Sequence, residues 1–128
     1  MTTGRSLAYR KKNRLCRQGE FDRVFSEGRK VPVDALTLFV APGATEGPRL
    51  GLAVSKKLGN AVRRNRIRRL LKEAFRRLLP AIEISIDIVV LPRKDRFPDD
   101  LEGVREALAA ALEKWRRSSR APQRTQSP

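Results

Sequence analysis

Residues 49–69 read RLGLAVSKKLGNAVRRNRIRR, and this stretch carries the pattern that decides the fold. Its first part alternates the apolar Leu50, Leu52 and Val54 with small residues, which predicts a strand. A polar loop follows, and Asn60 at its end can cap a helix because its side-chain oxygen can accept a bond from a free backbone N–H. The stretch therefore predicts a strand, a basic loop and a basic helix in succession.

The helix is predicted over residues 61–79, ending before or at Pro80. Its apolar stripe at helical spacing consists of Ile67, Leu70, Leu71, Ala74 and Leu78. The other faces carry seven Arg and one Lys against Glu73 alone, a local net charge of +7. Like charges three and four residues apart destabilise an isolated helix by roughly a few tenths of a kcal/mol per pair. A bound polyphosphate would relieve this repulsion, whereas the competing interpretation is a solvated basic face without a partner.

The sequence before this stretch predicts a short helix and another strand. From Glu20 onward, Phe21, Val24 and Phe25 have the spacing of one helical face, and Gly28 stands where a C-terminal cap belongs. Residues 36–40 alternate as a strand, and we expect them to run antiparallel to the strand at 50–54.

The sequence after the basic helix predicts a strand and a long helix. Residues 82–90 alternate apolar and polar side chains and become fully apolar at the end. Asp99 with Glu102 forms a capping-box pattern ahead of an amphipathic helix that reaches Trp115. The order is helix, strand, strand, helix, strand, helix, which predicts an α/β (α+β) two-layer sandwich.

A chain of 128 residues has material for one hydrophobic core. We expect a basic flexible arm at residues 1–14, a single domain at 15–117 and a disordered polar tail at 118–128.

Charge is the dominant feature of the composition. The chain has 29 Lys plus Arg against 14 Asp plus Glu, a net charge of +15. A polyanion is the natural partner of such a surface, with nucleic acid favoured over an anionic membrane. The chain has no His and a single Cys, which excludes His-based triads and thiolate zinc sites. Without a predicted membrane span or signal peptide, we expect a cytoplasmic protein.

Two smaller sets of residues are candidates for function. Phe21, Phe25 and Phe39 can stack on unpaired bases beside a basic groove, although burial in the core is the competing interpretation. Asp99 and Asp100 are adjacent and can in principle hold a divalent cation, but acids at a helix start are ordinarily a cap.

The stretch at 49–69 resembles the signature of the bacterial ribonuclease P protein family, and the resemblance extends over residues 14–115. Its most diagnostic part is Arg64, Asn65 and Arg66, because charge alone would not require an asparagine between two arginines. The family often has Lys at the position of Arg68 and Tyr at the position of Phe39. We therefore expect stacking from Phe39 but no hydroxyl contact.

The resemblance implies a ribosomal-protein-like domain with a small mixed sheet and a left-handed βαβ crossover. It implies the noncatalytic protein subunit of an endoribonuclease whose catalytic RNA, with Mg²⁺, removes the 5′ leader from precursor tRNA. No catalytic residue, no metal ligand and no protein partner are then expected on this chain. The implied contacts to the catalytic RNA are Lys56, Lys57, Arg64, Asn65, Arg66, Arg68, Arg69 and Lys72. The implied leader-binding cleft is formed by Phe21, Phe25 and Phe39.

Two other functions remain open from the sequence. A ribosome-associated structural protein would use the same charge and fold to bind ribosomal RNA. A protein nuclease acting by itself would depend on Asp99 and Asp100.

Overall fold

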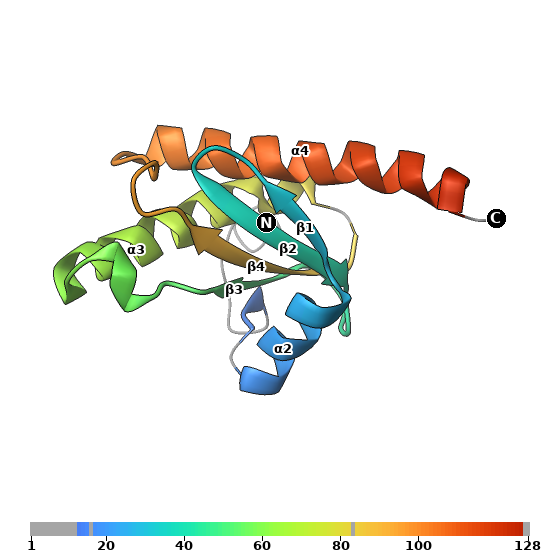
Figure 1. The fold of residues 1–128 in the computed structure, drawn as a ribbon, viewed down its shortest axis with the longest axis horizontal. Coiled ribbons are helices and arrows are strands. Elements are labelled where there is room, and N and C mark those ends of the chain that lie inside the picture. Colours follow the sequence, from blue (N-terminus) through green and yellow to red (C-terminus); the bar gives the residue numbers. More distant parts are fainter. Residues whose placement is uncertain (1–12, 16, 83, 127–128) are drawn as a thin grey trace, which may run out of the picture.

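The computed structural model describes residues 13–15, 17–82 and 84–126. These residues form three α-helices and four strands (Figure 1). In chain order the elements are α2 (Gln18–Glu27), β1 (Arg29–Pro32), β2 (Leu36–Pro42), β3 (Arg49–Leu52), the 3₁₀ turn η2 (Lys56–Leu58), α3 (Ala61–Leu78), the 3₁₀ turn η3 (Leu79–Ala81), β4 (Ile86–Pro92) and α4 (Leu101–Gln126).

The α+β class and the order of elements are confirmed, with one strand added. β1 directly follows the C-cap of α2 at Gly28 and pairs antiparallel with β2. It has only four residues and ends at Pro32, so its pattern is too short to stand out in the sequence. Gly28 has an ordinary negative φ, and it is glycine because a Cβ there would lie 2.4 Å from the carbonyl oxygen of Val24.

The sheet is mixed, with strand order β1-β2-β4-β3. β2 and β3 run in opposite directions as predicted, but they are not paired, because β4 lies between them. β4 is antiparallel to β2 and parallel to β3, and α3 connects the two parallel strands. The left-handed sense of this crossover stays a prediction.

Helices cover both faces of the sheet. α3 and α4 pack against one face over the main core, where Leu38, Leu71, Phe75 and Ile88 are fully buried. This is the predicted pairing of a helical layer with a sheet layer. α2 covers part of the opposite face, where Val24 packs in a second, smaller cluster (Figure 1). The strands β2 and β4 therefore bury side chains on both faces.

Element boundaries differ from the sequence pattern in two places. β4 begins at Ile86 rather than at residue 82, because the chain first makes the turn η3, which contains Pro80, and Ile84 is left half-exposed. At the start of α4, the capping residue is Asp100 rather than Asp99, since its Oδ1 accepts the Gly103 N–H at 3.1 Å.

Described residues near both chain ends lie in defined structure. Asn13 is buried and donates its side-chain N–H to the Pro48 carbonyl, and Arg14 bridges to Leu50 of β3, so these two residues are not part of a free arm. The rest of that arm and Cys16 lie outside the described residues. α4 runs to Gln126 and so includes residues 118–126 of the expected polar tail, while the bounds of the domain stay a prediction.

Candidate nucleic-acid interface

The N-terminus of α3 is built around the turn before it. The Asn60 side chain accepts the Arg63 N–H at 2.9 Å, which confirms the predicted cap. Arg63 and Arg64 fold back, and their Nε atoms donate to the carbonyls of Leu58 at 2.8 Å and Gly59 at 3.1 Å. Gly59 has φ +131°, a conformation that side chains rarely adopt. The loop is thus held in one shape against the start of the helix.

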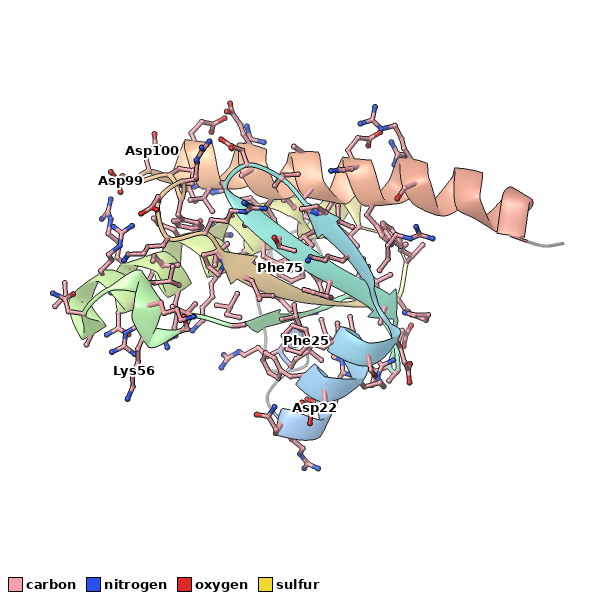
Figure 2. All side chains as sticks on the ribbon, in the orientation of Figure 1. Asp22, Phe25, Lys56, Phe75, Asp99 and Asp100 are labelled. Atoms are coloured by element: carbon pink, nitrogen blue, oxygen red, sulfur yellow. The ribbon has the colours of Figure 1, made fainter. Side chains whose placement is uncertain are left out.

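Lys56 and Lys57 occupy the turn η2 within this loop and are both exposed. Figure 2 shows Lys56 pointing away from the body of the protein. Because the loop backbone is fixed by two arginines of α3, these lysines stand at a defined place next to the basic helix. They form one charged surface with it.

The Arg64-Asn65-Arg66 motif has a structural explanation for its asparagine. Asn65 Oδ1 accepts a bond from Arg68 Nη1 at 3.0 Å, so it orients a guanidinium one turn further along the helix. Arg66 donates to the backbone carbonyl of Asp99, which ties α3 to the segment before α4. A guanidinium has five N–H donors, so one internal bond leaves others for phosphate oxygens.

Arg69 and Lys72 complete the predicted set further along α3. They line a groove of about 440 Å³ between α3 and the start of α4, together with Leu70, Leu101 and two residues of an ion-pair cluster. Arg69 is exposed and Lys72 is half-buried. The residues predicted to bind RNA therefore lie on one connected stretch, η2 and the N-terminal two-thirds of α3.

The C-terminal part of α3 is partly charge-compensated, with one glutamate for two arginines. Glu73 accepts bonds from Arg76 and from Arg77 Nε, the latter at 3.1 Å. The hydrogen bond from Arg76, followed by that from Arg77, lowers the pKa of Glu73 to about 2 although partial burial opposes this. Residues 63–72 carry six cations and no acid, so the uncompensated charge is concentrated there.

An aromatic groove lies on the other side of the sheet, under α2. It has a volume of about 510 Å³ and is lined by Gln18, Phe21, Phe25, Leu52, Ala53, Val54, Ser55, Leu91 and Pro92. Phe25 is 36% exposed, far more than a core phenylalanine such as Phe75. Figure 2 shows Phe25 on the α2 side of the sheet, whereas Phe75 lies on the side of the long helices.

Phe39 is placed differently from the other two predicted aromatic residues. It does not line the groove but packs against Phe25 edge to face, with ring centroids 5.0 Å apart. Its role in the groove is therefore to hold the Phe25 ring from behind. The structure brings all three phenylalanines together, two as walls and one as support.

The floor of the groove follows the small residues of β3 and the segment after it. Ala53 and Ser55 line the groove. Gly51 does not, because it is buried and the Phe21 ring lies over it. Ser55 is followed directly by Lys56, so the aromatic groove leads into the basic loop.

A buried ion network beneath α2 was not foreseen from the sequence. Asp87 is fully buried on β4 and accepts two bonds from Arg49, from Nε at 3.0 Å and from Nη2 at 2.9 Å. Asp87 also pairs with Arg23, and Arg49 Nη1 reaches Glu20 Oε2 at 2.9 Å. The hydrogen bond to Asp87, with a further one to Glu20, raises the pKa of Arg49 although burial opposes this. The signal in the sequence was a carboxylate between the apolar Ile86 and Ile88 of a buried strand.

Asp99 and Asp100 are engaged in local structure. Asp100 caps α4, and the Asp99 carbonyl accepts from Arg66. Among the residues that the structure describes, no three His, Cys, Asp or Glu side chains gather closely enough to hold a metal ion. In the same part of the chain, no helix is both long and apolar enough to span a membrane.

The sequence of this chain matches a known protein family and named relatives. Residues 9–116 match the family model described as Ribonuclease P. The ribonuclease P protein component of Chloroflexus aggregans is 45% identical over 80 residues, which are 62% of this chain and 59% of that relative. The corresponding protein of an Exiguobacterium species is 36% identical over 114 residues, or 87% of this chain and 99% of that relative.

Solved structures show the same fold. The RNase P protein of Thermotoga maritima is 34% identical, with a TM-score of 0.67 over 76% of this chain and 92% of that chain. The RNase P protein of Staphylococcus aureus is 28% identical, with a TM-score of 0.70 over 79% and 93% of the two chains. The chain therefore belongs to the ribonuclease P protein family, as the protein subunit of the ribonucleoprotein endoribonuclease that matures the 5′ ends of tRNA.

Proposed function

We propose that this subunit uses two adjoining surfaces for two different RNA segments in the cytoplasm, without a further protein subunit. The basic surface, defined as Lys56, Lys57, Arg64, Asn65, Arg66, Arg68, Arg69 and Lys72, contacts the RNase P RNA. The aromatic groove, defined by Phe21 and Phe25 with Phe39 behind them, takes the single-stranded 5′ leader of precursor tRNA.

The single observation that carries this proposal is the continuity of the two surfaces at Ser55 and Lys56. Ser55 lines the aromatic groove, and Lys56 begins the basic loop. A groove of about 510 Å³ lined by the partly exposed Phe25 suits a stacked base, and stacking is tolerant of sequence. Leaders of precursor tRNAs differ in sequence, so a stacking groove fits them better than hydrogen-bond readout.

Electrostatics explains what the basic surface contributes. Six cations within residues 63–72 lower the repulsion between phosphates of two RNA molecules brought together. The RNA, with its bound Mg²⁺, supplies the cleavage chemistry in this proposal. The protein binds the RNase P RNA and positions the 5′ leader, and it lowers the Mg²⁺ concentration that the RNA needs.

Substrate binding by the reconstituted holoenzyme tests the groove. In a Phe21→Ala, Phe25→Ala double variant, affinity for precursor tRNA with a leader is expected to fall at least about tenfold, because stacking is worth ~1–3 kcal/mol per base. Affinity for leaderless tRNA is expected to stay unchanged. Ile84→Ala is a matched control, because Ile84 is an exposed apolar side chain outside the groove. Unchanged affinity for the leader-bearing precursor in the double variant would show that the leader does not bind in this groove.

A further inference from the structure

The buried ion network holds α2 at two successive turns, and these are the turns that carry the groove phenylalanines. Glu20 precedes Phe21 in the sequence, and Arg23 lies between Phe21 and Phe25. Glu20 reaches Arg49 of β3, and Arg23 reaches Asp87 of β4. Both contacts end on the sheet that supplies the groove floor.

Glu20 joins the helix end to the sheet through both of its carboxylate oxygens. Oε1 accepts the Arg17 backbone N–H at 3.1 Å, and Oε2 accepts Arg49 Nη1 at 2.9 Å. One oxygen therefore closes the first turn of α2, while the other ties that turn to β3. A side chain shorter by one methylene could not keep both contacts without moving the helix.

Arg49 is itself fixed, so it is a rigid anchor for Glu20. Its guanidinium makes a two-point contact with Asp87, and this geometry sets both its position and its plane. Arg49 is 8% exposed and Asp87 is fully buried, so water competes little for these bonds. The position of α2 above the sheet follows from this anchor.

The α2–sheet packing offers few other constraints. Val24 is the one residue of α2 that is buried, and the other apolar contacts of this helix come from two partly exposed rings, Phe21 beside the small cluster and Phe25 against Phe39 of β2. A short helix with one buried residue can rotate or tilt unless polar contacts fix it. Such a change would alter the spacing between the Phe rings and the Ala53–Ser55 segment.

We infer that Glu20 and Arg49 are positioning residues for the 5′ leader, because their ion pair, anchored on Asp87, sets the width of the aromatic groove. The inference rests on the proposed function of the groove. Glu20 and Arg49 act through Phe21 and Phe25 and make no contact with RNA in this account.

A double-mutant comparison in the reconstituted holoenzyme tests the inference. Four proteins are compared: wild type, Glu20→Gln, Phe21→Ala with Phe25→Ala, and the triple variant. Dissociation constants are measured for precursor tRNA with a leader and for leaderless tRNA. Glu20→Gln is expected to weaken leader binding about tenfold, the scale of one charge-assisted hydrogen bond, and to leave leaderless tRNA unaffected. The triple variant is expected to bind the leader no more weakly than the phenylalanine double variant.

Two further variants separate positioning from charge and from folding. Glu20→Asp keeps the charge but is one methylene shorter, so positioning predicts a loss like that of Glu20→Gln, whereas long-range electrostatics predicts none. Glu113→Gln is the matched control, because Glu113 pairs with Arg116 at an exposed site on α4, outside the ion network beneath α2. The unfolding temperatures of the Glu20 variants and of this control are expected to stay close to the wild-type value. Their affinities for the RNase P RNA are expected to stay close to the wild-type affinity.

The outcomes distinguish the two proposals. If the phenylalanine double variant binds the leader normally, the proposed groove function fails and this inference fails with it. If that variant loses leader binding but Glu20→Gln and Glu20→Asp do not, only the positioning role is overturned. A further loss in the triple variant beyond the double variant would also overturn it, since Glu20 would then act outside the groove.

Discussion

Phe21 lies directly over Gly51, so closely that a Cβ on Gly51 would come within 2.8 Å of the Phe21 Cζ atom. Gly51 has no positive φ, so the reason for glycine is space and not backbone conformation. The same added atom would lie 3.0 Å from Leu15 Cβ. The ring that forms a wall of the groove thus depends on the absence of a side chain on β3.

The first prediction concerns this contact. Gly51→Ala should displace the Phe21 ring and lower the free energy of unfolding by ~1–3 kcal/mol, as overpacking commonly does. Urea denaturation of the isolated protein measures the change. Gly19→Ala is the control, because nothing lies within 4 Å of its added Cβ and alanine favours the helix. Equal stability of both variants would contradict the close packing of Phe21 on β3.

The second prediction concerns Asp87. Asp87→Asn removes the buried carboxylate that Arg49 and Arg23 share and should cost about 3–5 kcal/mol of stability. Asp34→Asn is a matched substitution in the exposed ion pair with Arg96, where at most ~1 kcal/mol is expected. Denaturant unfolding of both proteins gives the comparison. Similar small effects in the two variants would show that the network contributes little to the fold.

The third prediction concerns salt. Arg69→Gln removes one exposed cation from the basic surface, so the slope of log affinity for the RNase P RNA against log salt should become shallower by about one. The control is Arg105→Gln on α4, because Arg105 pairs with Glu102 and lies outside the basic surface. Filter binding across a salt series measures both slopes. A slope that changes in the Arg105→Gln variant but not in the Arg69→Gln variant would show that the RNA binds outside the basic surface.

The fourth prediction concerns acid. Arg76 and Arg77 hold the pKa of Glu73 at about 2, below its ordinary value of 4.5. A lowered folded-state pKa stabilises the fold above pH 4.5, and this contribution is lost as the pH falls toward 2. Because the side chain is 35% exposed, the contribution should stay below ~1 kcal/mol.

Unfolding of wild type and Glu73→Gln from about pH 6 to about pH 2 tests this sign. The stability difference between the two proteins should shrink on acidification. A difference that stays constant over this range would show that the two arginines do not perturb Glu73.

Local patterns in the sequence were enough to predict the basic helix and its cap. The cap at Asn60, the apolar stripe with Ile67 and the first helix depend on neighbours within one or two turns. Asp99 and Asp100 both fit a capping pattern, so the sequence pattern placed the start of α4 one residue early.

Features that join distant parts of the chain were not predictable in the same way. β4 inserts between β2 and β3, and no local pattern contains this order. The ion network joins Arg23 and Arg49 to Asp87 across separations of 64 and 38 residues. Helical spacing placed Phe21 and Phe25 on one helix face, and the family resemblance implied the cleft, but only the packed structure shows Phe39 against Phe25.

The central claim is that two adjoining surfaces of one small domain contact two different RNAs. Photocrosslinking from a benzoyl-phenylalanine placed at position 25 or at position 69 of the holoenzyme, with labelled precursor tRNA bound, tests it most directly. We expect position 25 to capture the 5′ leader and position 69 to capture the RNase P RNA. Capture of the RNase P RNA from position 25, with no leader product, would contradict the account.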